Sequence, residues 1–336
     1  MATPAPASTG TWTPPPGRLG NLTLTQEAAL AKFGTELRAE GAWVEARHDD
    51  ATLLRFLRAR KFDVPKAKEM ILACEKWRKE FGVDELVRSF KFTELKEVDK
   101  YYPQYYHHMD KSGRPIYIER IGALNVKALY ACTSLDRLLS HLVVEYESFL
   151  TTRLPSCSSA IGHPVDTSLT ILDLGGVSLS NFIRVKDYVR AATNIGQNYY
   201  PECMGAFYII NAPWAFGAVW RAIRPWLDEV TASKVKILGG PAVYRPELLS
   251  VCEKEALPKE FGGECECPGG CSLSDVGPWN PSGSGSETES EGEVAASPTE
   301  SASEKTSPTP TLTNPPSALA EKILLEHPVT TQVLSA

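Results

Sequence analysis

The fold is decided by residues 168–212, which read SLTILDLGGVSLSNFIRVKDYVRAATNIGQNYYPECMGAFYIINA. Short runs at the two ends of this stretch, 168–174 and 206–212, are rich in apolar, β-branched and aromatic residues and are bounded by turn residues, which is typical of strands. The residues between them, about 181–196, predict a helix. Because two parallel strands need a crossover connection, the order strand–helix–strand favours a parallel pair.

Strands and helices also alternate on both sides of this stretch. Residues 114–119 and 235–238 predict two more strands, and about 134–153 and 214–227 predict two more helices. This alternation is typical of an α/β fold, in which helices pack on a mostly parallel sheet. We expect that fold for residues 96–280.

Residues 21–95 predict an all-helical N-terminal unit. Its clearest helix has Asp63 as the N-terminal cap, Pro65 in the first turn and Gly82 at the end. Apolar side chains at helical spacing fall on one face of this helix: Ala67, Met70, Ile71, Cys74, Trp77 and Phe81.

The two ends of the chain differ from the rest in composition. Residues 1–20 are rich in Pro, Ala and Thr, whereas 281–336 lack aromatic residues and are rich in Ser, Thr, Pro and Glu, so we expect both to be disordered. The acidic tail, 281–336, holds eight acidic residues against two lysines and so carries the whole net charge of −6. The rest of the chain is neutral, which argues against nucleic acid as a partner.

Several features indicate a soluble, cytoplasmic protein. No run of 18 apolar residues is present, and the N-terminus lacks the basic start and apolar run of a secretory signal. Eight cysteines are scattered along a chain without an export signal, which favours reduced thiols in the cytosol.

The sequence predicts no catalytic residues. It contains no P-loop, no GxGxxG after a strand, no GxSxG elbow and no HExxH motif, so we expect a protein that is not an enzyme. Cys265, Cys267 and Cys271 cluster in a loop rich in Gly and Pro, and three thiols need a fourth ligand to hold zinc. No His or Cys follows them at a suitable spacing, and the adjacent pair His107-His108 is expected to be surface or core, so we predict no metal site.

The helix predicted at 214–227 is apolar on most sides. Two interpretations stay open: a helix buried against the sheet, or a lid that faces an apolar pocket on one side and a membrane surface on the other. The side chains that make it apolar include Phe216, Val219, Trp220, Ile223, Trp226 and Leu227.

Four motifs carry a resemblance to a known family. They read LLRFLRARKFD at 53–63, YPQYYH at 102–107, QNYYPE at 197–202 and IINAP at 209–213. Over about residues 20–280 the chain resembles the CRAL-TRIO lipid-binding family, and within it the fungal-type secretory-pathway phosphatidylinositol/phosphatidylcholine transfer proteins. The resemblance implies a hydrophobic pocket floored by the sheet and closed by a gate helix at 214–227. It also implies that two phospholipids bind one at a time in this pocket.

The resemblance further implies separate headgroup sites for the two lipids. For phosphatidylinositol, cations for the phosphate and polar groups for the inositol are expected at Arg60, Lys61, Glu202, Thr231 and Lys234. For phosphatidylcholine, aromatic faces for the choline and hydroxyls for the phosphate are expected at Tyr106, Tyr117, Tyr146, Ser168 and Thr170. Cys203 departs from the arginine that close relatives carry, so the phosphatidylinositol end is expected to be rearranged.

The expected function is exchange of single phospholipids between membranes and presentation of phosphatidylinositol to lipid kinases in Golgi secretion. The expected partners are a phospholipid as ligand, without any other cofactor, a transient Golgi or endosomal membrane surface and phosphatidylinositol kinases, and the protein is expected to be a monomer. The alternatives are a lipid sensor or scaffold that transfers nothing, and a carrier of another apolar ligand such as a sterol.

Overall fold

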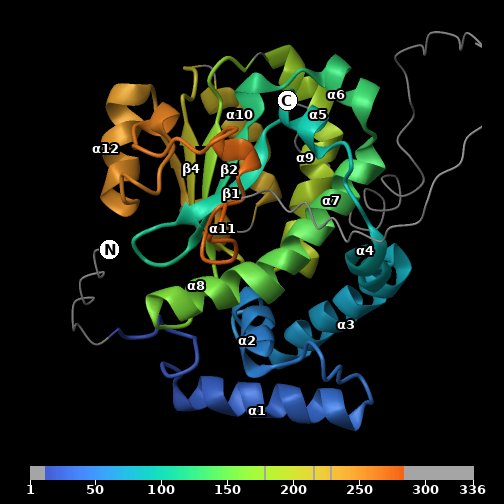
Figure 1. Ribbon diagram of the computed structural model, residues 1–336. Coiled ribbons are helices and arrows are strands. Elements are labelled where there is room, and N and C mark those ends of the chain that lie inside the picture. Colours follow the sequence, from blue (N-terminus) through green and yellow to red (C-terminus); the bar gives the residue numbers. More distant parts are fainter. Residues whose placement is uncertain (1–11, 178, 215, 228, 284–336) are drawn as a thin grey trace, which may run out of the picture.

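The computed structural model describes residues 12–177, 179–214, 216–227 and 229–283 (Figure 1). The predictions for residues 1–11 and for all but the first three residues of the acidic tail therefore lie outside the described residues.

A five-stranded sheet forms the centre of the molecule, with the strands in sequence order. The strands are β1 (Gln104–Met109), β2 (Pro115–Arg120), β3 (Ser168–Asp173), β4 (Met204–Ile210) and β5 (Val235–Ile237). β1 pairs with β2 in antiparallel fashion, and every other pairing is parallel, as predicted. The sequence did not predict β1, because a register shift between Tyr106 and Met109 breaks the alternation on which strand prediction depends.

The N-terminal unit is helical, as predicted, and its first three helices lie below the sheet in Figure 1. Its helices are α1 (Leu24–Ala39), α2 (Asp50–Ala59), α3 (Val64–Phe81), α4 (Val83–Ser89) and α5 (Leu95–Asp99). The carboxylate of Asp63 caps α3 by accepting from the Lys66 amide at 3.1 Å, and Gly82 ends it in the left-handed conformation, φ 75°.

Helices cover both faces of the sheet (Figure 1). One face packs against α12 (Pro241–Val251), and the other faces a group of helices that is continuous with the N-terminal unit. This group includes α6 (Val126–Cys132), α7 (Leu135–Ser148), α8 (Leu154–Ile161), α9 (Leu179–Tyr199) and α10 (Phe216–Ile223), while the short α11 (Glu229–Ser233) precedes β5. A π-helical turn, Phe149–Arg153, joins α7 to α8. Among the described helices, none has the length and hydropathy that a membrane span requires.

Residues 12–20 are ordered, so the prediction of disorder over 1–20 is wrong for this part. The Trp12 ring stacks on His163 with centroids 4.4 Å apart. Arg18 donates to the Asp166 carboxylate at 2.7 Å, and Arg58 of α2 donates to the same carboxylate at 3.1 Å. Composition did not reveal this docking because the partners lie far away in the sequence.

A buried ion pair joins the helical unit to the second domain. The Arg78 guanidinium on α3 donates to the Glu147 carboxylate on α7 at 2.5 and 3.1 Å, and the Tyr200 hydroxyl donates to the same carboxylate at 2.7 Å. Burial by itself lowers the pKa of Arg78, but the hydrogen bonds and charge of Glu147 outweigh it and raise this pKa. The guanidinium therefore stays charged, and besides Glu147 it also donates to the half-exposed Asp84 carboxylate at 2.8 Å.

We expect Glu147→Gln to lower the free energy of unfolding by about 3 kcal/mol, because it replaces the buried carboxylate by a neutral amide and leaves Arg78 only the more exposed Asp84 carboxylate. Urea unfolding followed by circular dichroism measures this loss. The matched control is Glu85→Gln, which breaks the exposed Glu85–Arg88 pair and should leave the unfolding midpoint unchanged. A midpoint for Glu147→Gln as high as that of the control would contradict the expectation.

Candidate functional site

A cavity of about 280 Å³ lies between the helical face of the sheet and helices α7 and α9. Alternate residues of β1 to β3 form its floor, because successive side chains on a strand point to opposite faces. The floor comprises Gln104, Tyr106, Tyr117, Glu119, Ser168, Thr170 and Leu172, and the walls include Leu142, Tyr146, Phe149, Tyr188 and Ala192.

The five residues predicted for the phosphatidylcholine headgroup all line this cavity. Tyr106 pairs with Tyr117 across β1 and β2, and Tyr117 pairs with Thr170 across β2 and β3, so these three side chains form a row on the floor. The Tyr106 and Tyr117 rings are 5.0 Å apart. Tyr146 enters from α7 and stacks on Tyr200 at 4.5 Å. Residues separated by up to 64 positions therefore meet in one place, as the resemblance implied.

The aromatic floor is uncharged and fixed in position. Burial raises the pKa of Tyr106 and of Tyr117 well above the usual range, so both hydroxyls stay protonated. The Arg153 guanidinium lies 4.3 Å from the centroid of the Tyr106 ring, a cation–π contact. Arg153 itself is held by the Glu145 carboxylate at 3.1 Å and the Asp275 carboxylate at 3.4 Å.

Glu119 lies on the same floor and was missed by the sequence analysis. Burial raises the pKa of its carboxyl group, which accepts hydrogen bonds from the Tyr102 hydroxyl and, at 3.5 Å, from the Gln104 amide. Glu119 thus adds an acidic group to a floor that also carries Gln104, Ser168 and Thr170. The signal was present, because Glu119 follows Tyr117 by two positions on a predicted strand and so shares its face.

The residues predicted for phosphatidylinositol are only partly gathered. The Glu202 carboxylate lies 3.7 Å from the Lys234 ammonium, and Lys234 also donates to the Met204 carbonyl at 2.9 Å. The backbone amide of Lys234 donates to the Thr231 carbonyl at 3.1 Å, which keeps these two residues in one turn. Within the described part of the chain, neither Arg60 nor Lys61 forms an ion pair with Glu202.

Arg58 occupies the position next to Glu202 instead. Its Nε atom lies 3.7 Å from the Glu202 carboxylate, and this buried nitrogen has no hydrogen-bond partner. Desolvation lowers the pKa of Arg58, and the carboxylates of Asp166 and Glu202 act against that shift. The sequence motif contains Arg58, but only the structure shows that it points at Glu202.

The backbone is strained on both sides of this contact. Lys61 and Phe62, just after α2, have φ of 51° and 62°, and Glu202 has φ of 60°. The left-handed region is uncommon for residues other than glycine, and such strain clusters at functional sites. The two loops that meet through Arg58 and Glu202 are therefore held in one specific geometry.

Cys203 lies at the boundary between the two predicted headgroup sites. It lines the cavity, and Arg55 of α2 donates to its sulfur at 3.4 Å. Burial raises the pKa of the Cys203 thiol, so the sulfur stays neutral. Arg55 thus brings a guanidinium to the place where the resemblance implied an arginine at position 203.

The predicted gate helix corresponds to α10 and the following 3-10 turn, Arg224–Trp226. Phe216 is buried, Val219 and Trp220 are partly buried against the core, and Leu227 is half-buried. The side chains of Ile223 and Trp226 lie outside the described residues. Trp214, which precedes the helix, is 97% exposed. An apolar helix that covers the core and has an exposed tryptophan at its start fits the lid interpretation.

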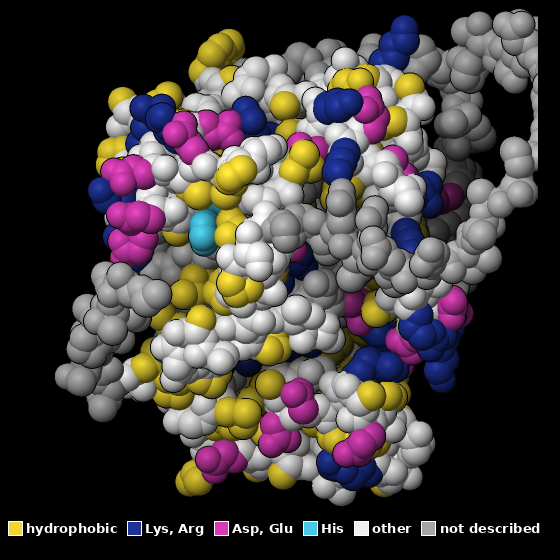
Figure 2. Space-filling model, in the orientation of Figure 1, with side chains coloured by type: hydrophobic (Ala, Val, Ile, Leu, Met, Phe, Trp, Pro, Cys, Tyr) yellow, Lys and Arg dark blue, Asp and Glu magenta, His cyan; other side chains and the backbone are white. Residues whose placement is uncertain are grey.

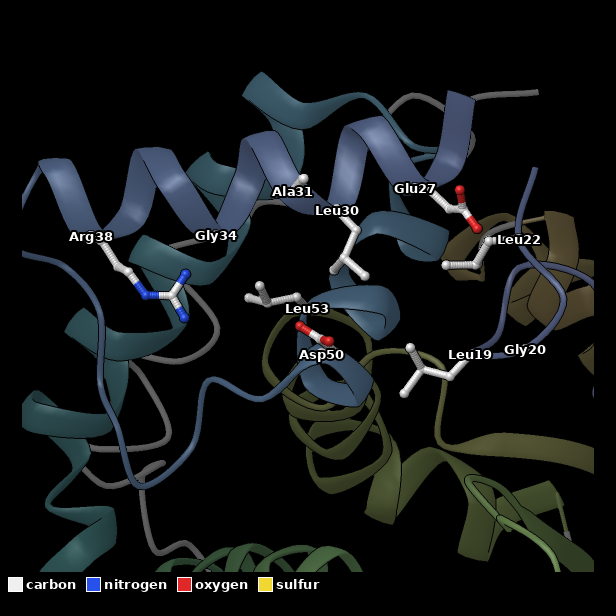
Figure 3. Close-up of a pocket in the computed structure, with 10 residues that line it drawn as sticks. All are labelled: Leu19, Gly20, Leu22, Glu27, Leu30, Ala31, Gly34, Arg38, Asp50 and Leu53. Carbon is white, nitrogen blue, oxygen red and sulfur yellow. The ribbon is translucent and has the colours of Figure 1, made fainter. Parts of the chain in front are cut away.

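Figure 3 shows a second cavity, of about 470 Å³, between α1, α2 and the turn at residues 19–22. Charged groups of Glu27, Arg38 and Asp50 lie among its leucines, and it contains none of the predicted site residues. On the face of the molecule in Figure 2, basic and acidic side chains are interspersed rather than separated into patches of one sign. We therefore place the functional site in the cavity at the sheet.

The three clustered cysteines lie apart from this cavity. His107 points to the opposite side of β1 from Tyr106, and its Nε2 atom is 3.3 Å from the Cys265 sulfur. The argument that predicted no metal site was wrong in one respect, because it sought the fourth ligand only after the cysteines. In the structure His107, which precedes Cys265 by 158 residues, lies beside the cysteines.

Comparison with known families matches residues 99–263 to the CRAL/TRIO domain and residues 27–73 to the CRAL/TRIO N-terminal domain. The SEC14 cytosolic factor of Kluyveromyces lactis is 52% identical over 266 residues, which cover 78% of this chain and 87% of that protein. A phosphatidylinositol/phosphatidylcholine transfer protein of Arabidopsis thaliana, SFH7, is 43% identical over 238 residues, 70% of this chain and 43% of its own length. The crystal structure of Sfh5 superimposes with a TM-score of 0.50 at 18% identity, covers 63% of this chain and 80% of that one, and supports the fold.

We expect Ala192→Phe to close the cavity, because Ala192 projects into it from α9 and a phenyl ring fills much of its volume. A fluorescent fatty acid whose emission reports an apolar environment should bind at least about tenfold more weakly to this variant, a loss of about 1.4 kcal/mol. Ala73→Phe on the exposed side of α3 is the matched control and should bind like the unmodified protein. Equal binding by all three proteins would show that the probe does not enter the cavity.

Proposed function

The chain belongs to the CRAL/TRIO domain family, and on that premise we propose that it transfers phosphatidylinositol and phosphatidylcholine between membranes, one molecule at a time. The observation that carries the proposal is the convergence of Tyr106, Tyr117, Tyr146, Ser168 and Thr170 on one cavity. The similar proteins include one named as a phosphatidylinositol/phosphatidylcholine transfer protein, 43% of whose length is matched.

The floor of the cavity has the chemistry that a phosphocholine group requires. Choline is a quaternary ammonium without hydrogen-bond donors, so aromatic faces bind it best. The phosphate needs donors, and the hydroxyls of Ser168 and Thr170 stand two positions apart on the same face of β3. Tyrosine rings and hydroxyls thus lie next to each other, in the order that ammonium and phosphate require.

The headgroup of phosphatidylinositol binds at a different place, where charged side chains gather around Glu202. Lys234 and Arg58 flank the Glu202 carboxylate, each at 3.7 Å. A phosphodiester carries the same sign of charge as Glu202 and attracts both cations. Glu202 is then free to accept hydrogen bonds from inositol hydroxyls, which explains why an acid stands among cations in this site.

Extraction of a lipid requires that the cavity grow. Two acyl chains hold about 30 methylene groups, and exposing them to water would cost on the order of 25 kcal/mol. The cavity of about 280 Å³ is at the lower limit of pockets that hold drug-sized ligands, about 300–1,000 Å³. A phospholipid is larger, so a wall must move, and the apolar helix α10 is the element suited to do so at a membrane surface.

We further propose that the protein works from the cytoplasm, binds Golgi membranes peripherally and presents phosphatidylinositol to lipid kinases. It acts as a carrier rather than an enzyme. Mass spectrometry of the ligand that copurifies with the protein distinguishes this proposal from a sterol carrier. Transfer of labelled lipid between liposomes distinguishes it from a sensor that only binds.

We expect two variants to separate the two lipids. Replacing Ser168 and Thr170 together by Ala should lower phosphatidylcholine transfer about 100-fold and spare phosphatidylinositol, because two hydrogen bonds to a charged phosphate are lost at about 1.5 kcal/mol or more each. Lys234→Ala should lower phosphatidylinositol transfer at least about tenfold and spare phosphatidylcholine.

Transfer between liposomes that carry one labelled lipid at a time measures both activities in the same preparation. Lys61→Ala tests a solvent-exposed member of the set, and this variant should resemble Lys234→Ala if the Lys61 ammonium reaches the bound phosphate. Equal loss of both lipids in each variant would contradict separate headgroup sites.

A further inference from the structure

We propose that His107, Cys265, Cys267 and Cys271 bind one zinc ion that fastens the C-terminal segment, residues 253–283, to strand β1. One nitrogen and three sulfur atoms of these side chains all lie within 4.8 Å of one another. All three cysteines are free thiols. This site lies on the face of the sheet opposite the lipid cavity, so it is separate from the proposed transfer function.

The distances match a tetrahedral zinc site. With Zn–S near 2.3 Å and Zn–N near 2.0–2.1 Å, the edges of the tetrahedron are about 3.8 Å between sulfurs and about 3.5 Å between sulfur and nitrogen. In the structure the Cys265 and Cys267 sulfurs are 3.7 Å apart, and the His107 Nε2 atom is 3.3 Å from the Cys265 sulfur. These two edges match the tetrahedron, and the remaining edges, all within 4.8 Å, need to shorten by at most about 1 Å to close around one ion.

A second layer of hydrogen bonds orients the histidine. The Ser274 hydroxyl donates to the Cys271 carbonyl at 2.9 Å, so its oxygen is left to accept from the His107 Nδ1–H at 3.4 Å. This tautomer places the lone pair of Nε2 toward the three sulfurs. Metal-bound histidines usually donate their other ring N–H to an oxygen in this way.

The backbone also preorganises the cysteines. Between Cys267 and Cys271, Gly269 and Gly270 have φ of 80° and 101°, values that other residues rarely adopt, and the Gly270 amide donates to the Cys267 carbonyl at 3.0 Å. This tight turn brings the two thiols back to the same side. Cys265 is fixed separately, because its amide donates to the Leu257 carbonyl at 3.1 Å.

Four protein ligands leave no open position, so the site is structural rather than catalytic. Its ligands come from β1 and from a loop that runs directly into Asp275 and Trp279. Trp279 packs edge-on against Tyr106 at 6.2 Å, and Asp275 pairs with Arg153 beside that ring. Zinc would therefore hold the segment that supports the cavity floor from one end.

Metal analysis of the full chain, purified with a thiol reductant and without chelator, tests the proposal. We expect about one zinc ion per chain. Cys267→Ser, at a partly exposed position, should lower the zinc content at least about fivefold while the circular dichroism spectrum is retained. The matched control is Cys132→Ser, a partly exposed thiol outside the cluster, which should keep the full zinc content.

A second measurement does not depend on any variant. Replacement of the bound ion by cobalt should give the absorption of a tetrahedral thiolate site, and a strong chelator should lower the melting temperature by about 5 °C or more, reversibly on addition of zinc. The proposal would be overturned if the purified protein contained no zinc and its melting temperature changed neither with chelator nor with added zinc. So would a disulfide between any two of the three cysteines in protein purified with reductant.

Discussion

The structure depends on one constraint. Both faces of the sheet are covered by helices, but one face is fully packed with side chains and the other encloses a cavity. Successive side chains of a strand point to opposite faces, so β2 and β3 send Ile116, Ile118, Leu169 and Ile171 into a packed core against α12. Their neighbours in sequence point to the helical side and line a cavity. A packed face makes the sheet stiff, and this stiffness lets the other face hold an arrangement of tyrosines and hydroxyls without collapsing onto it.

A buried charged side chain, Arg153, determines which segments pack together next to the cavity. Arg153 is almost fully buried and must be paired, and its two carboxylates come from α7 and from the segment that ends at Trp279. Burying this guanidinium without a carboxylate partner would cost more free energy than the burial of its apolar surface contributes. The same cation also lies over the ring of Tyr106, so the stability of this wall and the proposed recognition of choline depend on one interaction.

The sequence was sufficient for features that local patterns encode. Four of the five strands, the parallel pairing and helix α3 followed from alternation, spacing and capping. β1 did not, because its register shift places His107 and His108 where alternation should continue. Arg58, Arg55 and the position of His107 beside the cysteines were also missed, since each contacts a residue more than 140 positions away. Residue types alone identify a candidate group but do not show what it faces.

The β1 side of the cavity makes more contacts with its surroundings than the α10 side does. This difference suits the lipid transfer that we propose. On the side of β1, Tyr106 is fixed by Arg153 and by Trp279, whose own segment carries the cysteine cluster. On the side of α10, Gly217 and Ala218 are exposed, and the helix contacts the core through a few apolar side chains such as Phe216. In the transfer mechanism that we propose, opening would separate α10 from the core before it disturbed the proposed headgroup floor. A carrier needs this order, because the lipid tails must leave while the polar end is still held.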